Sequence, residues 1–127
     1  MIVVDASVLI AHLDETDALH GRAVDALLAA AEEPLGCSPI TLAEVFVGPA
    51  RAGRLRDART AVADLDVVEI DLGGNAAARL AALRAETALK VPDCCVLLAA
   101  EDAQAEAVLT FDDRLARAAE QRRLRVV

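Results

Sequence analysis

The 127 residues of this chain suit one domain with one hydrophobic core. Hydrophobic residues make up 56% of the chain, which excludes an intrinsically disordered tail. An aromatic content of only 2% argues against binding single-stranded RNA by base stacking, and a formal net charge of −8 argues against a passive nucleic-acid binder.

Strand and helix patterns alternate through the first half of the chain. The expected elements are a strand at 2–4, helices at 7–13 and 18–31, a strand at 36–37, and a helix from 39 to about 48. Two capping signals support these bounds. Asp17 precedes the second helix, and Ser38 stands as an N-cap before Pro39 at the first helical position.

The same alternation continues to the last residue. The expected elements are helices at 53–65, 75–89, 93–104 and 112–123, and strands at 67–70, 107–109 and 124–127. Leu80, Leu83 and Ala88 are expected in the core. No linker or repeat interrupts the order, so residues 1–127 are predicted to form a single α/β domain. Its expected architecture is three-layer α/β/α with a central, mostly parallel sheet.

Four acidic residues lie near the expected carboxyl ends of the strands, where binding sites collect in parallel sheets. Asp5 ends the first strand, Asp112 follows the fourth, and Asp93 opens a helix. Glu44 lies about one and a half turns into the helix that follows the second strand. Four carboxylates together repel one another unless a cation lies between them, and Mg²⁺ or Mn²⁺ suits such an oxygen-only site.

Each of these acids also has a purely structural interpretation. Asp5 and Asp112 stand where helix caps stand, and Asp93 in a first helical turn favours the helix dipole. Glu44 stands in capping-box spacing with the threonine three residues before it, although a better helix start precedes that threonine. The spacing alone therefore leaves a metal site and four structural acids equally open.

Three cysteines, Cys37, Cys94 and Cys95, give neither a disulfide framework nor a zinc spacing. We expect them to be small buried hydrophobic residues in a cytoplasmic protein. No signal peptide is recognised, and no apolar run is long enough to span a membrane, so no membrane role is expected.

Four sequence motifs carry a family resemblance across the whole chain. They are V-V-D-A-S at 3–7, S-P-I-T-L-A-E-V at 38–45, K-V-P-D at 90–93 and L-T-F-D-D-R-L at 109–115. In this order they resemble the PIN-domain family and, more narrowly, the VapC-type ribonuclease toxins of type II toxin–antitoxin pairs. The resemblance implies a catalytic and metal-binding site made of Asp5, Glu44, Asp93 and Asp112, supported by the hydroxyls of Ser7 and Thr110.

The resemblance also implies an activity and partners. The expected reaction is hydrolysis of RNA phosphodiester bonds with Mg²⁺, or Mn²⁺ as a substitute. The expected partners are an RNA substrate, a cognate VapB-type antitoxin and a second copy of the chain in a homodimer. Two departures stand out. Cys94 and Cys95 occupy positions that are usually small or aliphatic, and Asp113 beside Asp112 leaves the fourth ligand open.

Further candidates and alternatives stay open at this stage. His12 and His20 are expected to be surface or packing residues. Candidate RNA-phosphate contacts are Arg51, Arg54, Arg56, Arg59, Arg114 and Arg117. A phosphatase of the haloacid-dehalogenase kind also places an Asp after its first strand, but Ser7 stands where its second Asp is usual. The remaining alternatives are an RNA-processing PIN nuclease without an antitoxin and a catalytically silent interaction module.

Overall fold

A five-stranded sheet forms the centre of the computed structural model, which describes all 127 residues. The strands are β1 (Ile2–Val4), β2 (Leu35–Cys37), β3 (Val67–Glu69), β4 (Ala107–Leu109) and β5 (Arg125–Val126). They lie in the order β3-β2-β1-β4-β5, and every neighbouring pair is parallel. In the central strand, Val3 pairs with Gly36 on one side and Val108 on the other. The prediction of a parallel sheet is confirmed.

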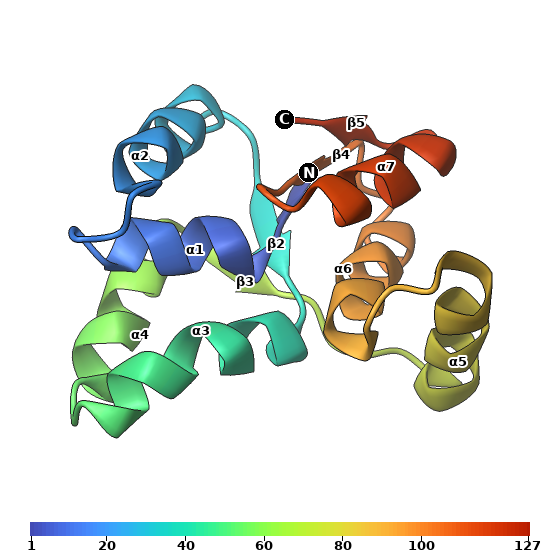
Figure 1. Cartoon of the computed structure of the whole chain (residues 1–127), viewed down its shortest axis with the longest axis horizontal. Helices are drawn as coiled ribbons and strands as arrows, with labels where there is room; N and C mark the ends of the chain where they lie inside the picture. The colour runs from blue at the N-terminus through green and yellow to red at the C-terminus, as the bar shows by residue number, and fades with distance from the viewer.

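Helices cover both faces of this sheet, which confirms the three-layer α/β/α architecture (Figure 1). One layer holds α1 (Ala6–Leu13), α2 (His20–Ala29), α3 (Pro39–Arg51) and α4 (Leu55–Ala63). The other holds α5 (Ala76–Thr87), α6 (Val91–Asp102) and α7 (Asp113–Gln121). None of these helices combines the length and apolar character needed to cross a membrane.

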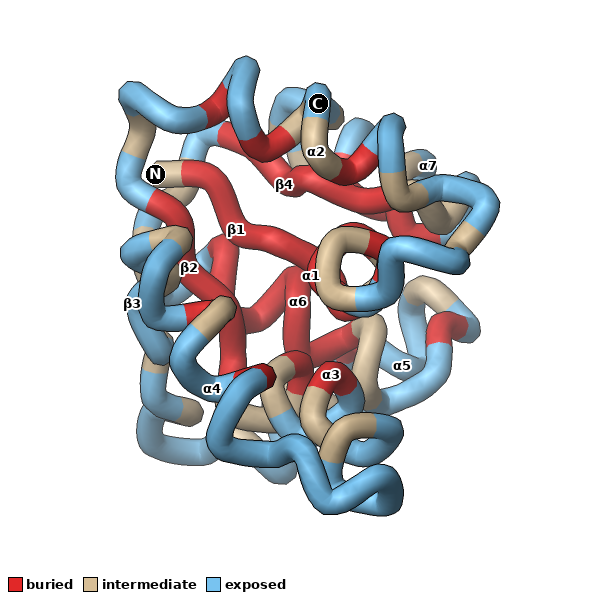
Figure 2. Tube along the Cα trace, turned by 90° about the vertical axis from the view of Figure 1, so that its left-hand side faces the viewer, coloured by how far each residue is buried: buried red, intermediate tan, exposed pale blue.

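The core consists of two apolar clusters, one on each side of the sheet. Side chains alternate between the faces along a strand, so Ile2 and Val4 belong to one cluster and Val3 to the other. Because helices cover both faces, β1, β2 and β4 are buried along their whole length, and so is most of α6 (Figure 2). The short apolar strands of the sequence are therefore the centre of the molecule.

The end of α3 lies beyond the predicted one. We expected the helix to stop near Gly48 and Pro49, but it runs to Arg51 with the proline inside its last turns. The stop signal is Gly53, which has a φ of +70°. Its N–H donates to the carbonyl of Ala50, and the next N–H, of Arg54, donates to that of Pro49, as in a Schellman motif. A left-handed glycine thus ended the helix where the proline did not.

Two helix starts differ from prediction for local reasons. Asp17 does not cap α2: its side chain accepts the N–H of Leu19 at 2.8 Å in a turn, and the helix begins at His20. Helix α6 begins at Val91, two residues before its predicted start. Pro92 lies in the first turn, where a missing N–H removes no helical hydrogen bond.

The end of α5 shows a wrong core assignment. Ala88 was expected in the core, but it is exposed and adopts a left-handed conformation with a φ of +59°. That turn ends the helix and directs Leu89 inward, where it is buried in the second cluster. Leu83 is buried as expected, and Leu80 is partly buried.

All three cysteines are free and buried, as expected for small apolar residues. Burial raises the pKa of the Cys37 thiol to about 12, and Glu69 adds to the shift. A thiol with such a pKa stays protonated at neutral pH and is a poor nucleophile or metal ligand.

Ser38 is the side chain that starts α3, and we expect its removal to destabilise the fold. Its hydroxyl is completely buried and accepts the N–H of Thr41 at 3.1 Å. Ser38→Ala leaves that donor unpaired and should lower the free energy of unfolding by about 1–3 kcal/mol. Urea denaturation measures this loss. Thr60→Ala, which removes an exposed hydroxyl bonded within α4, is the control and should change stability by less than about 0.5 kcal/mol.

Candidate active site

The carboxyl ends of β1 and β4 meet at one edge of the sheet. The two strands pair in register, with Val4 opposite Leu109, and the N–H of Asp5 donates to the carbonyl of Leu109 at 2.9 Å. The chain continues from β1 to β2 and β3 on one side, and later returns to β4 and β5 on the other. This is the switch point at which parallel α/β sheets bind ligands.

Asp5 is held at this edge by two hydroxyl groups. It is 5% exposed, and its Oδ2 accepts hydrogen bonds from Ser7 Oγ at 2.7 Å and Thr110 Oγ1 at 2.8 Å. Ser7 Oγ in turn accepts the N–H of Phe111, and Thr110 Oγ1 accepts that of Asp112. The two hydroxyls thus tie the acid after β1 to the loop after β4 and fix the direction of its carboxylate.

The structure shows which of the acids cap a helix and which do not. Asp5 occupies the N-cap position of α1, but its side chain makes no capping bond. Asp112 does cap α7, because its Oδ1 accepts the N–H groups of Arg114 and Leu115. Glu44 lies in the middle of α3, where Ser38 supplies the cap, so it belongs to no capping box.

The acids act on one another electrostatically. The pKa of Glu44 is raised, first by burial and then by the charges of Asp5 and Asp93. The pKa of Asp93 is also raised, by burial and then by Asp5 and Asp112. Four carboxylates from β1, α3, α6 and the start of α7 therefore share one region of negative potential. Repulsion makes it costly for all four side chains to be ionised together, and a bound cation would offset that cost.

These carboxylates do not form a closed metal cage. No group of three or more His, Cys, Asp or Glu side chains lies close enough to hold a metal ion. Their donor atoms nevertheless fit a hard cation, since all are carboxylate oxygens and only one oxygen each of Asp5 and Asp112 is used by hydrogen bonds. Asp113 is exposed in the first turn of α7 and is not among the charges that shift the pKa of Asp93.

Positive charges border the acids. Lys90 and Arg114 both act to lower the pKa of Asp93, against the burial and the neighbouring carboxylates that raise it. Arg22 of α2 lies over the ring of Phe111 in the loop after β4, with its guanidinium carbon 4.4 Å from the ring centroid. Neither Lys90 nor Arg22 was predicted from the sequence as a site residue. Lys90 belongs to the third motif, whereas a lone arginine on a helix carries no signal.

The other cationic candidates lie elsewhere. Helix α4 carries Arg56 and Arg59. Arg54 directly precedes the helix and pairs with Asp57 at 3.7 Å. His12 and His20 stack on each other with ring centroids 6.3 Å apart, in agreement with a packing role. Neither histidine is among the charges that shift the pKa values of Glu44 or Asp93.

The match to a known family covers this whole arrangement. Residues 2–121 match the PIN domain. The chain belongs to the PIN domain family. The matched range contains all four acids and both hydroxyls that hold Asp5. Membership favours the nuclease interpretation of this PIN domain over the phosphatase one.

Two solved structures of similar fold are described as a toxin–antitoxin complex and as a toxin. A toxin–antitoxin complex from Klebsiella pneumoniae is 27% identical with a TM-score of 0.75, over 91% of this chain and 90% of that one. VapC20 of Mycobacterium tuberculosis, described as a sarcin-ricin loop cleaving toxin, is 20% identical with a TM-score of 0.76, over 93% and 95%. FitAcB of Neisseria gonorrhoeae is 20% identical with a TM-score of 0.71, over 99% and 96%. The last two show the fold alone. No curated protein matches the sequence of this PIN domain.

Proposed function

We propose that this PIN domain is a metal-dependent endoribonuclease that hydrolyses RNA phosphodiester bonds, and that it is the toxin of a VapBC-type pair. The observation that carries the proposal is the buried carboxylate of Asp5. It is fixed by two hydroxyls at the switch point of the sheet, and its charge adds to the effect of burial in raising the pKa of both Glu44 and Asp93. Asp5 is buried, Glu44 is exposed and Asp93 is half-buried, and acids that raise one another's pKa at such a place often mark a functional site.

Asp5, Glu44, Asp93 and Asp112 would hold the divalent cation. Mg²⁺ and Mn²⁺ prefer the carboxylate oxygens that these residues offer. When bound, such a cation makes a metal-bound water acidic enough to supply hydroxide near neutral pH and neutralises charge on the phosphate. The repulsion that helps to raise the pKa values of Glu44 and Asp93 would favour binding of a cation between the acids.

The protein's own groups define the rest of the site. Ser7 and Thr110 orient Asp5 and leave its second oxygen for a ligand. Asp112 uses one oxygen to start α7, which fixes the position of the other. The main-chain N–H groups of Phe111 and Asp112 donate to the same two hydroxyls, so hydrogen bonds tie the loop after β4 to Asp5.

Cleavage of a mixed pool of structured RNA by the purified chain tests this function. We expect cutting in Mg²⁺ and in Mn²⁺ and none in EDTA. A folded, antitoxin-free chain that cuts no RNA in either metal and binds neither metal by calorimetry would contradict the proposal and favour the interaction module. Cutting by a chain whose gene has no antitoxin gene beside it would instead favour an RNA-processing nuclease.

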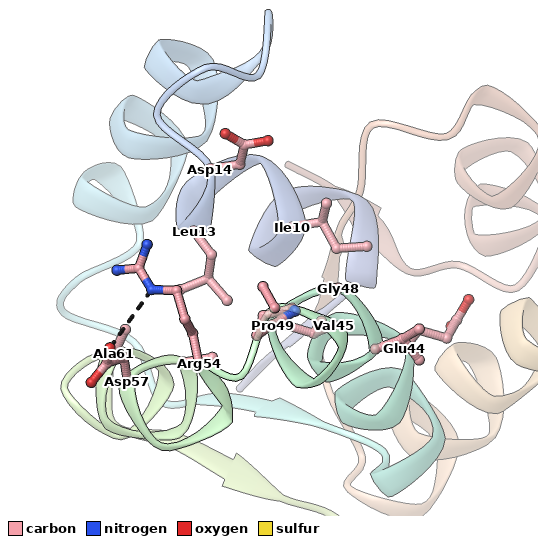
Figure 3. Close-up of a pocket in the computed structure, with 13 residues that line it drawn as sticks. Ile10, Leu13, Asp14, Glu44, Val45, Gly48, Pro49, Arg54, Asp57 and Ala61 are labelled. Carbon is pink, nitrogen blue, oxygen red and sulfur yellow. Dashed lines mark ion pairs between the residues drawn. The ribbon is translucent and has the colours of Figure 1, made fainter.

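A groove between α1, α3 and α4 is the surface we propose for the antitoxin. It has a volume of about 630 Å³, and its walls include Ile10, Leu13, Val47 and Pro49. Ile10 and Val47 are 42% and 45% exposed, more than is usual for such side chains. Figure 3 shows the apolar side chains between two polar ends, the Arg54–Asp57 ion pair at one and Glu44 at the other. An apolar antitoxin helix lying here would reach the edge of the acidic site.

A polar side chain in this groove should weaken antitoxin binding without touching catalysis. We expect Val47→Gln to lower the affinity for the VapB-type protein encoded beside this gene by roughly tenfold, since it puts an amide against an apolar partner. Titration calorimetry measures the affinity, and RNA cleavage should stay within about twofold. The control is Val68→Gln on the exposed edge strand β3. Equal effects of the two substitutions would place the antitoxin elsewhere.

We also propose that the chain forms a homodimer, on the family resemblance. Sedimentation equilibrium of the antitoxin-free protein should give twice the mass of the chain at micromolar concentration. A single-chain mass there would contradict the proposal and leave the nuclease function intact.

A further inference from the structure

The main chain of Phe111 lies in the loop after β4, and its ring packs against the core. It lies between Thr110 and Asp112, and its N–H donates to Ser7 Oγ at 3.1 Å. The ring is partly buried and packs against the core cluster beneath α1 and α2. In Figure 1 the loop between β4 and α7 turns towards α2. Phe111 therefore gives α2 a fixed support beside the acidic site.

Arg22 uses that support. Its guanidinium carbon lies 4.4 Å from the centroid of the Phe111 ring, within the range of a cation–π contact. The side chain is exposed and takes part in none of the five ion pairs of the protein, although Asp25 follows it by three residues on α2. The contact with the ring uses none of the N–H donors of the guanidinium in a hydrogen bond, so these donors can bind a ligand.

Cations near the acids would favour binding of an RNA backbone by this negatively charged protein. The chain has a net charge of −8, and the four carboxylates add a local field that repels a phosphate backbone. Lys90 and Arg114 act on Asp93 from the starts of α6 and α7. Arg22 reaches the loop after β4 from α2, through its contact with the ring of Phe111. A guanidinium edge matches two phosphate oxygens in a bidentate contact, which a lysine ammonium does not.

We propose that Arg22, held on Phe111, binds an RNA phosphate next to the one that is cleaved. The inference rests on the proposed nuclease function and adds a substrate-positioning residue to it. The arginine already covers a face of the Phe111 ring, so that face is not available to stack a base, and the contact made is ionic. Because it is fixed to the loop that holds Asp5, the bound phosphate has a set distance from the acids.

Equilibrium RNA binding by an Asp93→Asn chain in Mg²⁺ tests the proposal, since that background is expected to bind RNA without cutting it. The probe is a fluorescein-labelled single-stranded RNA library of mixed sequence. Adding Arg22→Ala should weaken binding roughly tenfold and reduce the slope of log affinity against log salt by about 0.7. Arg22→Lys should keep the slope and recover part of the affinity. Arg59→Ala, which removes the same charge from α4, should change affinity less than about twofold.

A second variant removes the support and keeps the charge. Phe111→Leu preserves apolar packing, and we expect roughly threefold weaker binding with an unchanged salt slope. In the cleaving chain, Arg22→Ala should raise KM for RNA and leave kcat within about twofold. Melting temperatures check that each variant is folded.

The outcomes separate the two proposals. If the parent chain binds RNA but Arg22→Ala keeps its affinity and salt slope, or matches Arg59→Ala, Arg22 is a packing residue and only this inference fails. If the parent chain binds no RNA in Mg²⁺, the nuclease function itself fails, and the inference fails with it.

Discussion

Replacing Asp5 by asparagine is expected to reduce RNA cleavage by roughly 10³-fold or more while the chain stays folded. The side chains have the same size, and the amide oxygen of asparagine accepts hydrogen bonds from Ser7 and Thr110 as Oδ2 does now. In asparagine, however, a neutral NH2 group replaces the other oxygen of Asp5, and this group cannot bind a cation. The substitution therefore weakens metal binding and preserves the hydrogen bonds from Ser7 and Thr110.

Single-turnover cleavage of the RNA pool measures this loss, and titration with Mn²⁺ shows whether metal affinity falls with it. Asp113→Asn is the matched control. It makes the same change on the exposed acid beside Asp112 and should alter the rate by less than about threefold. Cleavage by the Asp5→Asn chain near the parent rate would place the reacting group elsewhere. A large loss in the Asp113→Asn chain would instead make that residue the fourth ligand.

The order and type of the elements could be predicted because local pattern and tertiary role agree in them. Runs such as Ile2–Val4 and Ala107–Leu109 are short, apolar and followed by an acid or a hydroxyl, which is how strands buried on both faces read. The predicted helix ends were wrong where two local sequence signals competed. Pro49 costs α3 one hydrogen bond without ending it, and the left-handed Gly53 ends the helix.

The candidate site could be predicted as a list of residues but not as a network. Strand ends and motif spacing led to the acids, since both depend on neighbours in sequence. The hydrogen bond from Thr110 to Asp5 joins residues 105 positions apart, and the Arg22–Phe111 stack joins α2 to the loop after β4. No local pattern encodes such contacts. The two interpretations of Asp112 also proved compatible in geometry, because one oxygen caps a helix and the other stays free.

Asp93→Asn is expected to abolish cleavage and, in metal-free protein, to raise stability. Burial raises the pKa of Asp93, and the charges of Asp5 and Asp112 raise it further, so the ionised side chain opposes folding. Removing the charge removes that cost. Because the group is partly exposed, solvent screens much of the effect, and we expect a gain of about 0.5–1 kcal/mol, or a few degrees in melting temperature.

The pH dependence identifies the source of this gain. A carboxyl whose folded-state pKa is raised favours the folded state fully below its unfolded pKa near 3.8, and that contribution is lost as pH rises through the folded pKa. In EDTA, the parent and the Asp93→Asn chain should therefore be about equally stable at pH 3. They should diverge as pH rises, with the variant more stable at pH 7. Thermal melts across this range measure the gap.

Mg²⁺ should reverse the order, because it stabilises the parent chain by binding to the acids and gives the variant little. The competing interpretation of Asp93 makes the opposite prediction. Its position in the first turn of α6 means that an ionised carboxylate also interacts favourably with the helix dipole. If the dipole outweighs repulsion from Asp5 and Asp112, Asp93→Asn will be the less stable protein in EDTA at pH 7. Asp93 would then be a structural acid, and the case for a metal site would lose one of its four ligands.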